Sequence, residues 1–271
     1  MDLQLVLDEF SITGEPELLS GGSQPTYKVN DLILKRVKET SLENNHSQEL
    51  IQWIAQWSNE IIEDGFRFPK AITTKGGKWI TQTEWTAWEF AKGRHVNTSD
   101  VPQVVDGIIA FHKAIKNIRK HPLMEDNQTP WGKADRWCWG EKPANLRPQV
   151  EPYVNQLYAL RKPVFGFTDQ LIHGDLNPEN ILIEPGLPPA FIDFAPFWRP
   201  VEFALGMFAN WIGPRQGDVK VLNYFRNVRE FDQMLIRANI RMLLIMNNFK
   251  DWEICSEKRA VELVIKYIRN K

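Results

Sequence analysis

The stretch from residue 171 to residue 194, LIHGDLNPENILIEPGLPPAFIDF, constrains the fold of this chain more than any other part. Two short apolar runs flank a turn rich in Pro and Gly, which is the pattern of a β-hairpin. Polar residues stand at the ends of these runs: His173, Asp175 and Asn180 precede the first, and Asp193 closes the second. A hairpin would therefore bring one amide and two carboxylates to its edges.

The spacing of these polar residues suits phosphoryl transfer from a nucleotide. That reaction needs a carboxylate to orient the acceptor hydroxyl and oxygen ligands to hold Mg²⁺ on the phosphates. In protein kinases the catalytic Asp and a metal-binding Asn are spaced as D-L-x-x-x-N, and a second Asp begins D-F-G. Asp175 and Asn180 reproduce the first spacing, and Asp193-Phe194-Ala195 matches the second motif except for its glycine.

Because His173-Gly174 precedes the aspartate where protein kinases have His-Arg, the stretch resembles the aminoglycoside phosphotransferase and choline kinase-like family. The resemblance implies an α+β class and a two-lobed protein-kinase-like fold. Its small antiparallel-sheet N-lobe, residues 1–92, would bind the nucleotide. Its mostly helical C-lobe, residues 93–271, would carry the catalytic loop, the metal ligands and the acceptor site.

The same resemblance implies a role for each polar residue of the stretch. Asp175 would be the catalytic base toward a hydroxyl of a small molecule, and Asn180 and Asp193 would hold Mg²⁺ on ATP. His173 would brace the loop. Asn177 replaces the lysine of the protein-kinase loop, which favours a small-molecule acceptor over a protein. The alternative is an ordinary turn between two buried strands.

Composition excludes several other classes of protein. The formal net charge of −1 and the pI of about 6.5 give no overall positive field for nucleic acid or anionic lipid. No apolar run approaches the roughly 20 residues of a membrane span, and the N-terminal MDLQLVLDEF is acidic where a secretory signal is basic. Cys138 and Cys255 form no CxxC motif, so neither disulfides nor zinc are indicated. We expect a cytoplasmic protein without nucleic-acid or membrane partners.

The N-terminal region carries two further patterns. Residues 2–10 have apolar side chains at helical spacing, which predicts an amphipathic helix. Gly21, Gly22 and Ser23 lie between two strand-like runs, where backbone N–H groups could approach phosphates closely. A plain hairpin turn explains these glycines equally well.

The run 32–37, LILKRV, predicts a strand on which Lys35 shares a face with apolar residues. Lys35 matches the lysine of the kinase V-A-I-K strand and would meet an ATP phosphate; a solvated edge lysine is the alternative. Residues 41–60 predict the following helix. By the resemblance, Glu49 on that helix would brace Lys35, with Glu43 as the fallback.

Residues 66–90 predict two or three strands, and the run 83–93 resembles the hinge of the family. In that arrangement the backbone near Glu89 and Ala91 would bond the adenine edge, Trp88 would lie beside the base, and ATP would occupy the cleft. A core strand filled with aromatic side chains is the alternative.

The C-terminal region predicts helices from about residue 99, over 149–160 and from 202 onward. Residues 121–148 read as irregular because they are rich in Pro, Gly and Trp. The tryptophans there could wall a substrate pocket or cover a core edge; they are Trp131, Trp137 and Trp139.

Basic residues exceed acidic ones between 213 and 250, which argues mildly against a polycationic antibiotic as acceptor, unless these charges are solvated helix faces. Fold kinship leaves the acceptor open among antibiotics, choline, sugars and amino-acid-like alcohols. Two alternatives remain: a nucleotide-binding pseudokinase or regulator, supported by the missing glycine at Ala195, and a protein kinase, disfavoured by Gly174 and the short segment after Asp193. The sequence is silent on the oligomeric state.

Overall fold

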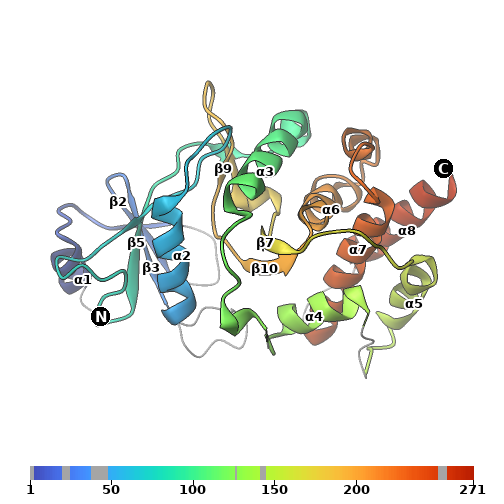
Figure 1. Cartoon of the computed structure of the whole chain (residues 1–271), viewed down its shortest axis with the longest axis horizontal. Helices are drawn as coiled ribbons and strands as arrows, with labels where there is room; N and C mark the ends of the chain where they lie inside the picture. The colour runs from blue at the N-terminus through green and yellow to red at the C-terminus, as the bar shows by residue number, and fades with distance from the viewer. Residues whose placement is uncertain (1–2, 20–24, 38–47, 126, 141–144, 250–254) are drawn as a thin grey trace.

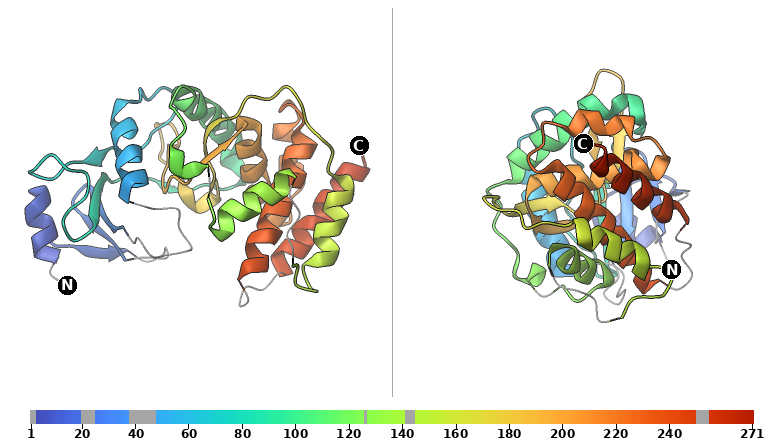
Figure 2. Two further views of the ribbon diagram at one scale, coloured as in Figure 1. Left: turned by 60° about the horizontal axis from the view of Figure 1, so that its bottom comes forward. Right: turned by 90° about the vertical axis from the view of Figure 1, so that its right-hand side faces the viewer.

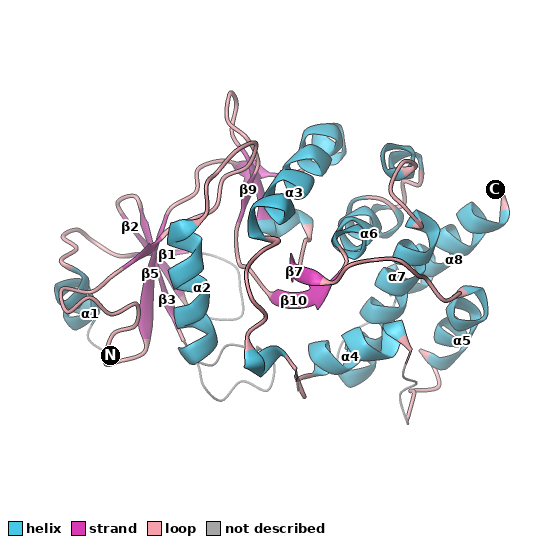
Figure 3. Ribbon diagram, viewed as in Figure 1, coloured by secondary structure: helices cyan, strands magenta, loops and turns pink. Residues whose placement is uncertain are grey.

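The structure is a computed structural model that describes residues 3–19, 25–37, 48–125, 127–140, 145–249 and 255–271. The molecule is elongated, and the two termini lie at opposite ends of its long axis (Figures 1 and 2). Strands dominate the N-terminal end and helices the C-terminal end (Figure 3). This division follows the predicted order of strand-like and helix-like patterns.

The N-terminal sheet is antiparallel throughout, with strand order β1-β2-β3-β5-β4. β3 lies at its centre and pairs with β5, so that Lys35 stands opposite Thr86. Side chains of opposed residues share a face of a sheet. The strands are β1 (Glu17–Leu19), β2 (Thr26–Val29), β3 (Leu32–Arg36), β4 (Ala71–Ile72) and β5 (Trp85–Glu89).

The two faces of this sheet have different neighbours. α1 (Leu3–Phe10) buries its apolar stripe in a cluster with Leu34 and Trp85, because these side chains point to the face opposite Lys35. α2 (Gln48–Glu60) packs instead with the main core of the molecule: the Trp57 ring lies 5.1 Å from that of Phe194, centroid to centroid. α2 therefore links the sheet to the segment that follows Asp193.

The middle of the chain forms two short sheets. β7 (Gln170–His173) pairs antiparallel with β10 (Pro196–Arg199), and the second sheet has the order β6-β8-β9. The predicted hairpin is present as β8 and β9, with Ile181 opposite Phe191. The remaining bounds are β6 (Arg94–His95), η3 (Pro178–Asn180), β8 (Ile181–Ile183) and β9 (Ala190–Phe191).

The helical part is organised around α7 (Phe231–Asn248), a helix that is buried along most of its length and packs against α4, α5, α6 and α8. Figure 3 shows these helices gathered at the end away from the large sheet. The other bounds are α3 (Val101–Ile115), α4 (Pro130–Trp139), α5 (Glu151–Leu160), α6 (Val201–Ile212), α8 (Cys255–Arg269), and the 3₁₀ turns η1 (Thr98–Asp100), η2 (Pro122–Met124), η4 (Pro214–Gln216) and η5 (Lys220–Phe225).

The fold class is confirmed, but the expectation for residues 121–148 is wrong. The stretch expected to be irregular, residues 121–148, contains α4, which Thr129 caps by accepting a hydrogen bond from Gly132 N at 3.1 Å. Pro130 stands at the first helical position, where its missing N–H costs no intrahelical bond. The Thr-Pro pair was therefore a helix start rather than a sign of irregular chain.

The alternative that the basic residues between 213 and 250 are solvated is also wrong for several of them. Arg237 and Arg241 are buried on α7, and Arg215 is mostly buried. Helical periodicity alone does not reveal this, because α7 is enclosed by other helices on nearly all sides.

Candidate active site

The strand that leads into the predicted catalytic loop is fixed by a buried histidine of α3. The His112 ring accepts a hydrogen bond at Nε2 from His173 N at 3.1 Å, and its Nδ1–H donates to Ile108 O at 2.7 Å. Burial lowers the pKa of His112 to about 3, so the ring is neutral at physiological pH. His112 is thus a packing residue.

His173 joins the two halves of the motif. Its Nδ1 accepts a hydrogen bond from Asp175 N at 3.2 Å, and its Nε2–H donates to Ile192 O at 2.9 Å. Burial lowers the pKa of His173, which leaves this ring neutral with both nitrogens in backbone bonds. The histidine braces the loop against the residue that precedes Asp193.

Asp175 and Asn180 are in direct contact across the loop. The Asn180 amide nitrogen donates to the Asp175 carboxylate, Oδ2, at 2.9 Å and to its backbone carbonyl at 2.9 Å. Asn180 O in turn accepts from Ile192 N at 3.0 Å. Because the amide nitrogen faces Asp175, the amide oxygen is the end of Asn180 that suits a cation.

Asp193 forms an ion pair with Lys35 of β3, across 158 positions of sequence. The backbone of Asp193 has φ +54°, a left-handed conformation that costs a non-Gly residue roughly 1 kcal/mol or more. About half of the Asp193 side chain and a third of the Lys35 side chain stay exposed (47% and 34%). Both groups therefore border solvent where the sheet meets the hairpin.

Two opposing effects act on the Lys35 ammonium. Burial lowers its pKa to about 8, while the Asp193 carboxylate and the remaining solvent exposure favour the charged form. We take Lys35 as charged at pH 7, since this pH lies below about 8. Trp88 and Thr86 share its face of the sheet, and Trp88 Nε1 donates to Thr86 Oγ1 at 3.0 Å.

Glu49 occupies a different place from the one that the resemblance implies. Its side chain is 72% exposed, and Oε1 lies 3.6 Å from His121 Nε2. Among the described residues, the ion-pair partner of Lys35 is Asp193 rather than Glu49. The bracing role of Glu49 stays a prediction.

Of the remaining residues predicted to contact the nucleotide, only Glu89 and Ala91 lie in the part of the chain that the structure describes. Gly21, Gly22 and Ser23 lie outside the described residues, although β1 and β2 on either side of them pair antiparallel. Glu89 ends β5, and its backbone N donates to Lys70 O at 2.9 Å. Ala91 belongs to the segment that connects β5 with β6.

The donor set fits a magnesium nucleotide. Mg²⁺ is commonly held by one or two protein oxygen ligands together with substrate phosphates, and Asn180 and Asp193 offer an amide oxygen and a carboxylate. Over the described ranges, no group of three or more His, Cys, Asp or Glu side chains forms a metal site. A magnesium ion bound here would share its coordination among these residues, the phosphates and water.

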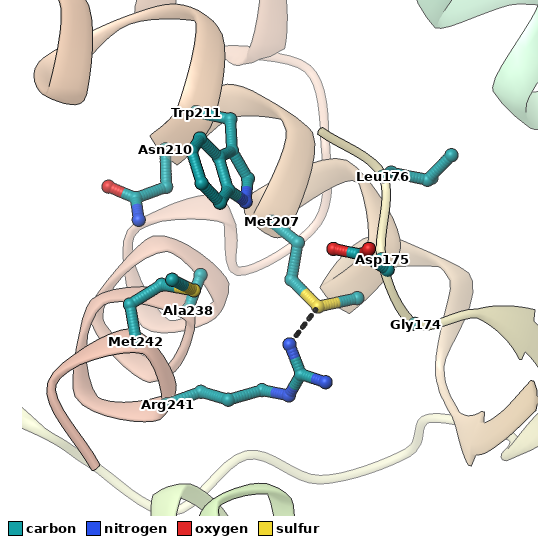
Figure 4. A pocket seen from close by; sticks show the side chains of 9 residues that line it. All are labelled: Gly174, Asp175, Leu176, Met207, Asn210, Trp211, Ala238, Arg241 and Met242. Atoms are coloured by element: carbon teal, nitrogen blue, oxygen red, sulfur yellow. Dashed lines mark hydrogen bonds between the residues drawn. The ribbon is translucent and has the colours of Figure 1, made fainter. Parts of the chain in front are cut away.

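A small pocket lies beside Asp175 on the side of the helices, and its lining side chains leave no room for a water molecule in it (Figure 4). The loop contributes Gly174, Asp175 and Leu176 to its wall. Two helices supply the rest: α6 gives Met207, Asn210 and Trp211, and α7 gives Ala238, Arg241 and Met242. Sequence motifs did not predict that these residues of α6 and α7 line a pocket, because both helices show only an apolar sequence pattern.

Residues 16–233 match the sequence profile of the phosphotransferase enzyme family, which is four fifths of the chain. The chain belongs to this family. A comparison with curated proteins found no match. The resemblance drawn from the catalytic-loop motifs is therefore confirmed at the level of the family.

Solved structures share the fold of this phosphotransferase-family chain at low sequence identity. A microcompartment-associated aminopropanol kinase has a TM-score of 0.70 at 15% identity, covering 99% of this chain and 98% of that one. The amicoumacin kinase hAmiN, solved in complex with AMP-PNP, Ca²⁺ and Ami, has a TM-score of 0.62 at 15% identity, with coverage of 100% and 94%. The choline kinase LicA from Streptococcus pneumoniae has 0.58 at 12%, with 99% of both chains covered.

The structure bears on the two alternatives for the tryptophans, which were a wall of a substrate pocket and a cover over a core edge. The tryptophans of α4 pack on the core: the Trp139 ring lies 5.4 Å from Phe203 and the Trp131 ring 5.2 Å from Phe249. They are not among the residues that line the pocket beside Asp175; the tryptophan that lines it is Trp211.

None of the helices in the described part is long and apolar enough to cross a membrane.

Proposed function

We propose that this protein transfers the γ-phosphoryl group of ATP to a hydroxyl of a small molecule, with Asp175 as the catalytic base. The observation that carries the proposal is a hydrogen-bonded network in which Asn180 binds Asp175, and both Asn180 and His173 bind the backbone of Ile192. The next residue, Asp193, pairs with Lys35 of the sheet. Residues from distant parts of the sequence thus meet at one edge, as phosphoryl transfer requires.

In the proposed reaction, the acceptor hydroxyl hydrogen-bonds to the Asp175 carboxylate. The proton passes to that carboxylate as the hydroxyl oxygen forms its bond to the γ-phosphorus, and the bond from the γ-phosphorus to the ADP oxygen breaks. The Asn180 amide N–H bonds to Oδ2, which orients the carboxylate. General-base assistance of this kind contributes about 10²- to 10⁴-fold to a rate.

Lys35 would contact the α- and β-phosphates, and Asn180 and Asp193 would hold Mg²⁺. The bound metal would neutralise charge on the phosphates. Lys35 can take this role because its ammonium already lies beside Asp193, on the face of the sheet opposite α1. Glu49 is left out of the mechanism, since its carboxylate faces His121.

The acceptor would bind between the loop, α6 and α7, where the flexible Met207 side chain must turn aside to make room for it. The segment after Asp193 supports a small molecule over a protein substrate, because it runs directly into β10. Residues 196–199 of that segment pair with β7, which leaves no long activation segment between Asp193 and α6.

A screen of small alcohols coupled to ADP release, with the variant Asp175→Ala, tests the proposal. We expect transfer to fall by about 10³-fold while Mg²⁺-dependent thermal stabilisation by ATP persists. Asp106→Ala, an exposed aspartate on α3, is the matched control and should retain activity. Undiminished transfer by Asp175→Ala would reject the role of Asp175. Stabilisation by ATP without turnover of any acceptor would favour a non-catalytic nucleotide-binding protein.

A further inference from the structure

The acceptor pocket contains a buried cation with no matching anion. Arg241 is only 3% exposed and lines the same pocket as Asp175. Its Nη1 donates to the Met207 thioether, Sδ, at 3.6 Å, and its guanidinium carbon lies 4.8 Å from the centre of the Phe197 ring. Within the described residues Arg241 makes no ion pair, and its Nε has no hydrogen-bond partner.

Other arginines in the same region are paired. Arg199 donates to the Asp135 carboxylate at 2.7 Å, and Arg215 pairs with Glu257. Arg237, one turn before Arg241 on α7 and equally buried, donates to Lys162 O at 2.7 Å and to Gln233. Arg237 Nε, like Arg241 Nε, has no hydrogen-bond partner in the described residues. Arg241 differs because none of its nitrogens donates to an oxygen there.

A second polar side chain in this pocket is also unsatisfied. Asn210 of α6 is fully buried, and neither Nδ2 nor Oδ1 has a hydrogen-bond partner in the described part of the chain. Buried polar groups nearly always have partners, and an unmade hydrogen bond costs about 1–3 kcal/mol. Arg241 and Asn210 are independent observations on two different helices, and both line the pocket beside Asp175.

We propose that the acceptor alcohol carries an anionic group, a carboxylate or a phosphate, that pairs with Arg241. This inference rests on the proposed function. The planar guanidinium binds such groups in a two-pronged way, and Asn210 lines the pocket from α6 with unused donor and acceptor groups. The hydroxyl of the acceptor would lie at Asp175 and its anionic group at Arg241; both residues line the pocket (Figure 4).

In this arrangement the Met207 sulfur occupies the place beside Arg241 that the anionic group would take. A thioether sulfur is a weak acceptor, so an oxyanion displaces it from Arg241 with a gain in hydrogen bonding. The Met207 side chain is flexible enough to turn aside. A cationic acceptor would instead meet the guanidinium, and its charge would be repelled.

Matched acceptors that differ in charge test the proposal. We would compare glycerate and glycerol 3-phosphate with glycerol, and homoserine with its methyl ester; ethanolamine and choline serve as cationic probes. We expect kcat/KM to be highest for an anionic member, and the glycerate and glycerol 3-phosphate arms separate a carboxylate from a phosphate. Calorimetric binding of the same two anions in the presence of AMP-PNP and Mg²⁺ gives a readout that needs no turnover.

The variants are Arg241→Met, Arg241→Lys and, as matched control, Arg237→Met. We expect Arg241→Met to raise KM or Kd for the anion about 10- to 100-fold, with KM for ATP unchanged and with no effect on an uncharged acceptor. Arg241→Lys should recover part of the loss. Arg237→Met should lower the thermal midpoint, because its carbonyl partners lose their donor, and leave the acceptor KM unaltered.

Two outcomes would overturn this inference. One is efficient turnover of cationic or neutral acceptors only; the other is anion binding that Arg241→Met does not weaken. Neither would harm the proposed function, which requires only that a hydroxyl accepts phosphate. If no acceptor is phosphorylated, the proposed function fails, and calorimetry still decides whether Arg241 binds an anion.

Discussion

The two sides of the candidate active site are built in different ways. On the nucleotide side, Lys35 and Asp193 pair with each other, and both keep part of their side chains in solvent. On the acceptor side, Arg241 and Asn210 are buried without oxygen or nitrogen partners in the described residues. The charged groups of the nucleotide side are paired with each other, whereas the hydrogen-bonding groups of the acceptor side remain available to a bound ligand.

This difference separates the residues that indicate the reaction class from those that indicate the acceptor specificity. A phosphate-binding side can be the same for every acceptor, because ATP is the same substrate in each case. An acceptor side must distinguish molecules, and buried polar groups do so strongly, since a wrong ligand leaves them unpaired. We therefore read the nucleotide side as evidence of the reaction class and the acceptor side as evidence of the substrate class.

The largest predicted effect falls on the nucleotide side, at Asp193. Asp193→Asn removes the carboxylate that we assign to Mg²⁺ and also breaks the ion pair with Lys35. We expect kcat to fall by roughly 10³-fold or more, and the Mg²⁺-dependent part of the ATP thermal shift to disappear. Steady-state kinetics and thermal melts with ATP, with and without EDTA, measure both. A variant that keeps its metal dependence would show that the nucleotide side is not assembled around Asp193.

Lys35 gives the next largest effect, with a defined pH dependence. Lys35→Met should raise KM for ATP about 10- to 100-fold, because a charged contact to the phosphates is lost. In the wild type, the ammonium has a pKa lowered to about 8, so it is charged below that pH and loses its proton as the pH rises through it. KM for ATP should therefore increase between pH 7 and pH 9.

Lys35→Arg serves as the control for that titration, since guanidinium stays protonated throughout this range. Its KM for ATP should be nearly flat with pH, apart from changes shared by all variants. The acceptor KM should not follow the same curve, because Arg241 lies on the other side of the site. A parallel rise in both KM values would contradict the separation of the two sides.

The nucleotide side was readable from sequence because its residues stand in short motifs. The spacing from Asp175 to Asn180 fits the direct hydrogen bond between these residues, and Asn180 also accepts from Ile192, which precedes Asp193. Their catalytic and metal-binding roles stay predictions. Lys35 could be found only through the resemblance, since 158 positions separate it from Asp193. Glu49 was assigned through the same resemblance and lies beside His121 in this structure, so its bracing role stays a prediction.

The acceptor side could not be read in this way. Arg241 and Asn210 lie on apolar helices whose spacing predicts a core but not which polar residue faces the pocket. The helix at Pro130–Trp139 was missed for a related reason: Pro and Trp signal irregular chain by composition, whereas the Thr129 cap acts through a single side-chain contact. Tertiary packing decides both cases.

A smaller effect is expected at the boundary of the two sides, at Gly174. A Cβ at this position would overlap the ring of Phe197, the same ring that lies under Arg241. Gly174→Ala should shift that ring, destabilise the fold by about 1–3 kcal/mol and lower kcat/KM about tenfold. Urea unfolding and acceptor kinetics measure the two consequences. The double variant Gly174→Ala, Phe197→Leu should recover stability, because the smaller side chain leaves room for the methyl group.

The smallest predicted effect concerns Glu49. Its carboxylate is mostly exposed and lies beside His121, and exposed ion pairs contribute 0–1 kcal/mol. We expect Glu49→Gln to change KM for ATP and kcat by less than about threefold, and His121→Gln to behave alike. The family resemblance gives the opposite expectation, in which Glu49 braces Lys35. A loss of about 30-fold with Glu49→Gln alone would mean that α2 moves when nucleotide binds and that Lys35 exchanges Asp193 for Glu49, so that Asp193 is freed for the metal.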